Sequence, residues 1–406
     1  MSRLLNDFLR YVKVDTTPCE DSSSSPSTPN QLDLLRMLES ELVEMGMEDV
    51  ELSAGGVLYS RLPGNAGGPV IGLIAHVDTS PEVSGTGVNP ILHHEWDGSV
   101  IELDGGVTVD PARSRDMMRY VGTTIVTSDG NTLLGADDKA GVAVIMDVLR
   151  RLLSDPSLPR PGVVAAFTPD EEIGRGVVNF DVKRFGADFA YTVDGGAVCE
   201  VETATFNAWS ADWSITGRQV HPGSACGLMV NAARIASEIV CAMKPEEMPE
   251  NSSGMKGFDY PMHVEGSTSS AKVRMILRDF SMEGMEKRRA RLESLRGYMA
   301  LKHPGARIEL AMKEQYRNPA GILEKDRRPV EYALRGAALA GIECVEGSIR
   351  GGTDGSRLSF MGLPSVNLPT GGELFHSREE WISERGLEIA RDIVLNTLGI
   401  WAEAGS

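Results

Sequence analysis

Two adjacent carboxylates, Asp137 and Asp138, stand between an apolar pair and a run of residues with helical spacing. This position predicts that they lie at the start of a helix. Neighbouring carboxylates repel each other unless a cation neutralises them, so the pair suggests a metal or a strong base nearby. The ordinary alternative is that Asp138 caps the helix N-terminus. The pair alone does not decide between these interpretations.

Residues able to bind a metal follow three short apolar runs, which are typical of strands buried on both faces of a sheet. The runs and the residues after them are 70–75 with His76, 163–167 with Glu171 and Glu172, and 189–193 with Asp194. A fourth strand, 365–368, is followed by a Gly-rich turn and His376. The carboxyl ends of the strands are where open α/β sheets build their sites. We therefore expect these side chains to converge.

The convergent set predicts a two-metal site of imidazole and carboxylate, suited to two zinc ions with cobalt or manganese as possible substitutes. Its predicted ligands are His76, Asp137, Glu172, Asp194 and His376. Asp137 would bridge the two ions. Two divalent ions about 3.5–4 Å apart can share a water and lower its pKa toward neutrality.

Two further acidic residues have predicted roles beside these ligands. Glu171 neighbours a ligand but points elsewhere, so we expect it to act as the general base toward the zinc-bridging water. Asp78 lies two residues after His76 and is placed to orient the imidazole through its other ring nitrogen. A substituted Glu171 should therefore abolish turnover without removing the metals.

The elements that must position these residues predict an α/β fold with a mixed, mainly parallel sheet flanked by helices. Between Trp209 and about Gln315 the pattern changes to alternating strands and two helices, typical of an inserted α+β domain. We expect a catalytic domain in two parts, 1–207 and 319–406, and an inserted lid domain, 208–318. The Ser- and Pro-rich segment 19–30 is expected to be an exposed loop without a role in the chemistry.

Composition limits the classes of partner. The chain has 406 residues and a formal net charge of −18, which disfavours nucleic-acid and membrane partners. Its five cysteines are scattered and include no Cys-x-x-Cys, so neither a disulfide framework nor a thiolate zinc site is indicated. The N-terminus does not resemble a signal peptide, and a cytoplasmic location is expected.

Several motifs resemble those of the M20 family of metallopeptidases, in the form found in its tripeptide aminopeptidases. They are 76–81 (HVDTSP), 133–141 (LLGADDKAG), 167–174 (FTPDEEIG), 191–196 (YTVDGG), 220–223 (VHPG), 277–280 (LRDF) and 350–355 (RGGTDG). The order and spacing of these motifs match the family pattern, and the resemblance covers essentially the whole chain. The resemblance implies a zinc-exopeptidase-like catalytic domain with two zinc ions, a lid domain, and a cis peptide between Asp137 and Asp138. It also implies release of the N-terminal residue from short peptides, chiefly tripeptides.

The same resemblance implies three substrate-binding residues in the insertion or after it. His221 would contact the tetrahedral intermediate, and Arg278 and Arg350 would bind the substrate carboxylate. A homodimer formed through the lid is a further expectation. Glu373 and Leu374 depart from the family pattern beside His376, which affects one wall of the substrate pocket. The alternatives are an M20 dipeptidase, an N-acyl-amino-acid hydrolase, or a catalytically inactive peptide-binding relative.

Overall fold

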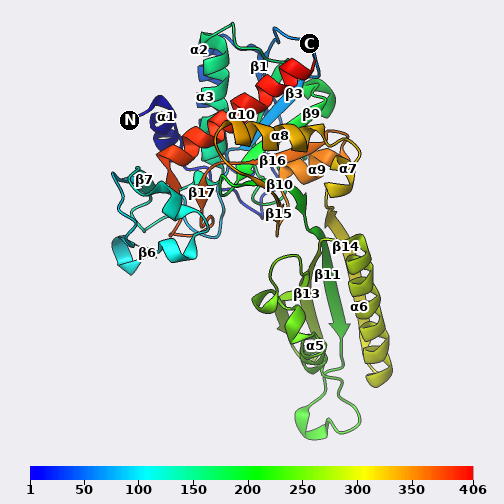
Figure 1. The fold of residues 1–406 in the computed structure, drawn as a ribbon. Helices are drawn as coiled ribbons and strands as arrows, with labels where there is room; N and C mark the ends of the chain where they lie inside the picture. Colours follow the sequence, from blue (N-terminus) through cyan, green and yellow to red (C-terminus); the bar gives the residue numbers. More distant parts are fainter. Residues whose placement is uncertain (406) are drawn as a thin grey trace. The chain divides into compact units, whose positions relative to one another are not determined.

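The computed structural model describes residues 1–405, which divide into two compact units (Figure 1). The first unit comprises Met1–Thr203, Pro319–Ser348 and the chain from Thr353 onward. The second comprises Ala204–Asn318 together with Ile349–Gly352. The second unit therefore interrupts the first twice along the chain, and the segment 208–318 lies wholly inside the second unit.

The first unit is built on an eight-stranded mixed sheet. Its spatial order is β1 (Glu48–Leu52), β2 (Leu58–Leu62), β8 (Val163–Thr168), β3 (Ile71–His76), β9 (Phe189–Gly195), β16 (Ser365–Pro369), β10 (Glu200–Thr205) and β15 (Val345–Ile349). The central strands β8, β3, β9 and β16 pair in parallel, whereas β1, β2 and β10 join antiparallel. The fold class expected from the sequence is confirmed.

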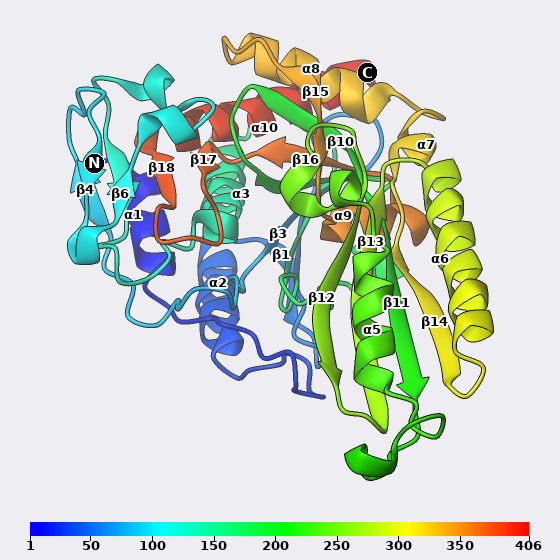
Figure 2. The ribbon, with the colours of Figure 1, turned by 90° about the horizontal axis from the view of Figure 1, so that it is seen from below.

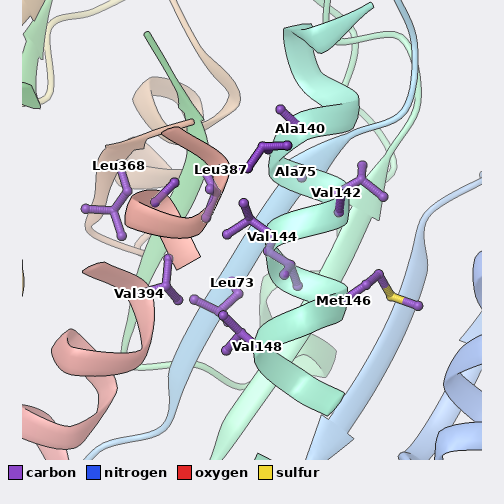
Figure 3. Close-up of a cluster of buried hydrophobic side chains, with 14 of the residues drawn as sticks. Leu73, Ala75, Ala140, Val142, Val144, Met146, Val148, Leu368, Leu387 and Val394 are labelled. Atoms are coloured by element: carbon purple, nitrogen blue, oxygen red, sulfur yellow. The ribbon is translucent and has the colours of Figure 1, made fainter. Parts of the chain in front are cut away.

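Helices cover both faces of this sheet. The larger core contains α1 (Arg3–Tyr11), α2 (Gln31–Met45), α3 (Ala136–Ser154), α8 (Arg328–Leu339) and α10 (Glu384–Ala404), and the smaller core contains α4 (Val182–Phe185) and α9 (Asp354–Phe360). Leu73 and Ala75 of β3 pack in the larger core beside α3 (Figure 3). Ile74, which points to the other face of the sheet, packs in the smaller core. Both faces of β3 are buried, which explains its unbroken apolar sequence.

The remaining elements of the first unit are short. They are α7 (Ala320–Leu323), a sheet of β17 (Gly372–Glu373), β18 (Trp381–Ser383), β7 (Ile125–Thr127) and β4 (Ile91–His93), and a pair of β5 (Ile101–Glu102) with β6 (Thr108–Val109). Among residues 1–405, no helix combines the length and apolar character that crossing a bilayer requires.

Close contact between α3 and β9 depends on a glycine. A Cβ added at Gly141 would fall 1.8 Å from the backbone oxygen of Val193 and 2.4 Å from the Asp138 carboxylate. Only glycine allows the helix to approach the strand so closely. This approach brings the start of α3 to the end of β9, where Asp194 lies.

The second unit is a four-stranded antiparallel sheet with two helices beside it (Figure 2). The sheet order is β12 (Phe258–Gly266), β13 (Ser270–Asp279), β11 (Asn207–Thr216) and β14 (Arg307–Tyr316), and the helices are α5 (Ala232–Cys241) and α6 (Met282–Lys302). Along β11, Trp213 and Ile215 are buried, whereas Asp212 and Ser214 are exposed. This alternation buries one face only, as expected for an α+β domain.

Candidate metal centre

The five residues expected to bind metal converge in the first unit, although they come from five separate segments. His76 is the last residue of β3, and Asp194 lies near the end of β9. The others are Glu172 in the turn after β8, Asp137 in the irregular first turn of α3, and His376 between β17 and β18. The edge formed by the carboxyl ends of the parallel strands therefore carries the site.

The five side chains form two groups of three that share Asp137. In one group, His76 Nε2 lies 3.0 Å from Asp137 Oδ1 and 3.4 Å from Asp194 Oδ1. In the other, His376 Nε2 lies 3.2 Å from Asp137 Oδ2 and 3.0 Å from Glu172 Oε1. Each oxygen of Asp137 thus faces a different histidine, which is the arrangement a bridging carboxylate needs.

These donor atoms fit divalent cations. Donor atoms that share a tetrahedral zinc at about 2.0–2.1 Å lie roughly 3.3 Å apart, close to the histidine–carboxylate separations in both groups. The buried Oε1 of Glu172 makes no hydrogen bond of good geometry among residues 1–405, although His376 Nε2 lies 3.0 Å away, as suits an atom directed at a metal. Imidazole and carboxylate donors without thiolate suit zinc, manganese or cobalt. The residues could therefore hold two metal ions.

The electrostatics of the cluster also favour bound cations. The pKa of Asp194 and that of Glu172 are raised to about 7, mainly by burial and also by the nearby Asp137 carboxylate, while histidine opposes the shift. Burial lowers the pKa of His376, but its contacts with Asp137 and Glu172 outweigh burial and raise it to about 11. Three largely buried carboxylates close together are stabilised by positive charge, which two divalent ions would supply.

Asp78 is fully buried and fixes two neighbouring segments at once. Its two oxygens accept the backbone N–H groups of Glu171, at 3.0 Å, and Glu172, at 3.1 Å. His76 Nδ1 lies 3.1 Å from the Asp78 backbone oxygen and 3.4 Å from its carboxylate. The geometry therefore lets Asp78 orient the imidazole, as the spacing predicts, and also hold the turn that carries both glutamates.

Glu171 lies beside the two groups without belonging to either. Burial raises the pKa of its carboxyl well above the ordinary value; His76 opposes this shift, and the carboxylates of Asp354, Asp194 and Glu172 add to it. A carboxylate in such surroundings holds a proton more readily than one in water. This property suits a residue that must accept a proton and then release it.

Asp138 caps the N-terminus of α3, which was the alternative to metal binding for the acidic pair. It is fully buried, and its Oδ1 accepts the backbone N–H of Gly141 at 3.1 Å while Oδ2 accepts that of His76 at 3.2 Å. The peptide bond between Asp137 and Asp138 is cis, as the family resemblance implies. The two carboxylates therefore face different surroundings, with Asp137 among the candidate ligands and Asp138 capping α3.

The segment 19–30 is not simply the exposed loop expected from its composition. Ser27 is buried, and both its backbone N–H, at 2.7 Å, and its hydroxyl donate to the carboxylate of Asp170, the residue before Glu171. Gln31 donates to the same carboxylate at 2.7 Å and accepts the Asp170 N–H at 3.0 Å. Asp170 has a positive φ of 60°, so these bonds hold an uncommon backbone conformation next to the candidate base.

We expect Gln31→Ala to lower the free energy of unfolding by about 1–3 kcal/mol, because it leaves the buried N–H of Asp170 without its acceptor and removes one donor to the Asp170 carboxylate. Urea unfolding of the purified protein measures this. The exposed neighbour Asn30, whose side chain makes no capping hydrogen bond, provides the control Asn30→Ala. Equal unfolding midpoints for the two variants would contradict the role assigned to Gln31.

Three acidic residues near the centre carry contacts that sequence reasoning did not identify. Asp354, in the first turn of α9, is buried and accepts a hydrogen bond from Thr168 Oγ1 at 2.8 Å. Glu373 accepts the N–H groups of Arg115 and Asp116 at 2.7 and 2.9 Å, and so fastens a neighbouring loop. The third is Glu380, whose carboxylate accepts three backbone N–H groups. Asp354 lies in the motif 350–355 (RGGTDG), so the sequence could have indicated that it belongs near the site. No local sequence pattern indicates the partners of Glu373.

The three residues expected to bind substrate all lie in the second unit. His221 is exposed and accepts the N–H of Gly223 at 3.1 Å. Arg278 lies 5.4 Å from the centre of the Tyr316 ring and donates to Gln315 at 3.3 Å. Arg350 donates to the backbone oxygens of Ser252, Gly254 and Lys256 and to the Ser252 hydroxyl. Four donors of Arg350 are thus engaged within its own unit, which leaves only Nε for another acceptor.

Comparison with known proteins places this chain among peptidases. Residues 126–399 match the model of the peptidase family M20/M25/M40. The chain is 43% identical over 405 residues to peptidase T of Clostridium perfringens, covering 99% of this chain and all of that protein.

Solved structures show the same fold at lower sequence identity. A tripeptidase from Staphylococcus aureus superposes with a TM-score of 0.77 at 22% identity, covering 99% of this chain and 98% of the other. A dinuclear metal-binding peptidase of the M20 family from Bacillus subtilis superposes with a TM-score of 0.67 at 17% identity, with the same coverage of each chain.

Proposed function

Because this chain belongs to the M20/M25/M40 family of peptidases, and within it to peptidase T, the tripeptide aminopeptidases, we propose that His76, Asp137, Glu172, Asp194 and His376 hold two zinc ions and that Glu171 is the general base. This proposal rests on the division of five donor residues into two groups that share Asp137. When bound, two divalent ions acidify the attacking water and polarise the scissile carbonyl.

The remaining chemistry falls to the protein's own residues. The Glu171 carboxylate accepts a proton as the water oxygen forms its bond to the carbonyl carbon. It then donates that proton to the amide nitrogen as the C–N bond breaks. The products are the N-terminal amino acid, with a new carboxylate, and a shortened peptide with a new amino terminus. Asp78 supports both steps because it holds the backbone of Glu171 and the side chain of His76.

Substrate recognition by the second unit is part of the same proposal. As a lid, this unit would supply His221 to the tetrahedral intermediate, and Arg278 and Arg350 to the peptide carboxylate. Burial lowers the pKa of Arg278, so a carboxylate partner would stabilise its charge. Arg350 has only Nε left, so it would have to release some of its present acceptors to bind a carboxylate with two hydrogen bonds, which makes Arg278 the better candidate.

Metal removal should stop the reaction, and a substrate panel should define it. We expect about two zinc ions per chain by elemental analysis, loss of activity with a chelator, and recovery with zinc, cobalt or manganese. A tripeptide should be cleaved faster than a dipeptide, a tetrapeptide or an N-acetylated tripeptide, with release of the first residue. Preference for the dipeptide or the acetylated peptide would instead support the dipeptidase or acyl-hydrolase alternative.

The exposed edge of the second unit favours association of two chains. The edge strand β12 exposes Tyr260, Met262 and Val264, and an open strand edge with exposed apolar side chains can pair with a second copy. We propose a homodimer formed through this unit and action in the cytoplasm. A monomer mass in solution would exclude the dimer without affecting the assignment of the metal centre.

A further inference from the structure

Glu380 is a buried acidic residue outside the proposed ligand set, and it lies between His376 and β18. Only 1% of its surface is exposed. Its Oε2 accepts the backbone N–H groups of Leu134, at 2.7 Å, and Gly135, at 2.8 Å, and its Oε1 accepts that of Asp137 at 3.1 Å. One carboxylate therefore satisfies three backbone donors from a distant part of the chain.

Those donors belong to the turn that delivers Asp137. Gly135 has a φ of 82°, and Asp137 has φ −82° and ψ 106°, so neither has helical geometry. Donors at the start of a helix have no intrahelical acceptor, and Leu134 and Ala136 are fully buried. An acceptor within the protein must therefore replace water, because an unpaired buried N–H is costly.

The position of this turn determines whether Asp137 can contact both histidines at once. Its two oxygens lie 3.0 Å from His76 Nε2 and 3.2 Å from His376 Nε2, so a rotation of its backbone would improve one contact and lengthen the other. Glu380 follows His376 by four residues. The same short segment thus carries one ligand and holds the backbone of another.

We propose that Glu380 is a positioning residue of the metal centre, whose carboxylate fixes the turn 134–137 so that Asp137 faces both metal positions. This inference rests on the proposed function. It assigns Glu380 no contact with substrate or metal; Glu380 acts through the backbone. A carboxylate is required because three N–H donors converge on it, and an amide would direct its own N–H₂ group at one of them.

Three variants separate positioning from a merely structural role. Glu380→Gln keeps the shape and loses the charge and one acceptor oxygen. Glu380→Asp keeps the charge, but its side chain is one methylene shorter, so the carboxylate lies farther from the three N–H donors. Glu379→Gln is the matched control, because Glu379 is the adjacent residue and pairs at the surface with Arg113. The measurements are zinc affinity of the metal-free proteins by competition with a chromophoric chelator, kcat and KM for a tripeptide, and urea unfolding without metal.

We expect Glu380→Gln to weaken zinc affinity by about 10–100-fold, as loss of a residue supporting a ligand typically does. We also expect it to lower kcat more than it changes KM. Glu380→Asp should lie between Glu380→Gln and wild type, and Glu379→Gln should match wild type. Glu380→Asp also supplies the test if Glu380→Gln does not fold.

Wild-type zinc affinity and kcat in the folded Glu380 variants, even with lowered stability, would overturn this inference. Zinc affinity does not depend on which peptide is cleaved. A wild-type protein that binds two zinc ions but cleaves no tripeptide would therefore refute the proposed function and leave the role of Glu380 open to the same measurement.

Discussion

Replacing Glu171 with Gln should lower kcat for a tripeptide by about 10²–10⁴-fold while two metal ions stay bound, since general-base catalysis contributes on that scale. The amide nearly keeps the size of the side chain but cannot accept the proton of the attacking water. Glu171 lies outside both groups of candidate ligands, so the metal content should not change. Steady-state kinetics and elemental analysis of the same preparation measure both effects.

The neighbouring residue provides the contrast. Glu172→Gln makes the same chemical change one position along the chain, but Glu172 Oε1 faces His376 Nε2 at 3.0 Å within a ligand group. We expect this variant to lose one metal ion as well as activity. If Glu171→Gln retained most of its activity, or lost metal as Glu172→Gln does, the division of roles between the two glutamates would be wrong.

Removing the shared carboxylate should have the second large effect. In Asp137→Ala both histidine-facing oxygens disappear, so we expect the bound metal to fall below two ions per chain. Loss of a supporting residue alone costs about 10–100-fold, and loss of a bridging ligand should cost more than about 100-fold in kcat/KM. Zinc titration of the metal-free protein and tripeptide kinetics measure these changes.

A control for lost negative charge lies at the other end of the same helix. Asp155 follows α3 as its C-terminal cap and is exposed, so Asp155→Ala should leave zinc binding and kcat/KM unchanged. Two tightly bound ions in Asp137→Ala would show that the two groups do not share this ligand.

The strands and their terminal residues could be predicted because each carries a local signal. Val70 to Ala75 is apolar without interruption since β3 is covered on both faces, and His76 directly follows this run. The same logic places Asp194 at the end of β9. The end of α2 has a local signal as well, because Gly46, with φ 87°, has the left-handed conformation in which glycine ends helices.

The parts that sequence reasoning missed depend on contacts between distant segments. The partners of Glu380 lie about 245 residues earlier in the chain, and Ser27 meets Asp170 across 143 residues. A Ser- and Pro-rich composition is compatible with an exposed loop as well as with a segment packed against the protein. The sequence of segment 19–30 therefore did not indicate that Ser27 is buried. Strand β12 was also not predicted, because most of its residues are exposed and its sequence contains Pro261.

Anomalous diffraction from crystals grown with zinc tests the central claim most directly. The account predicts two anomalous peaks about 3.5–4 Å apart, one beside His76 and Asp194, the other beside His376 and Glu172, with an oxygen of Asp137 reaching each. A single peak, or two peaks that do not share Asp137, would contradict it.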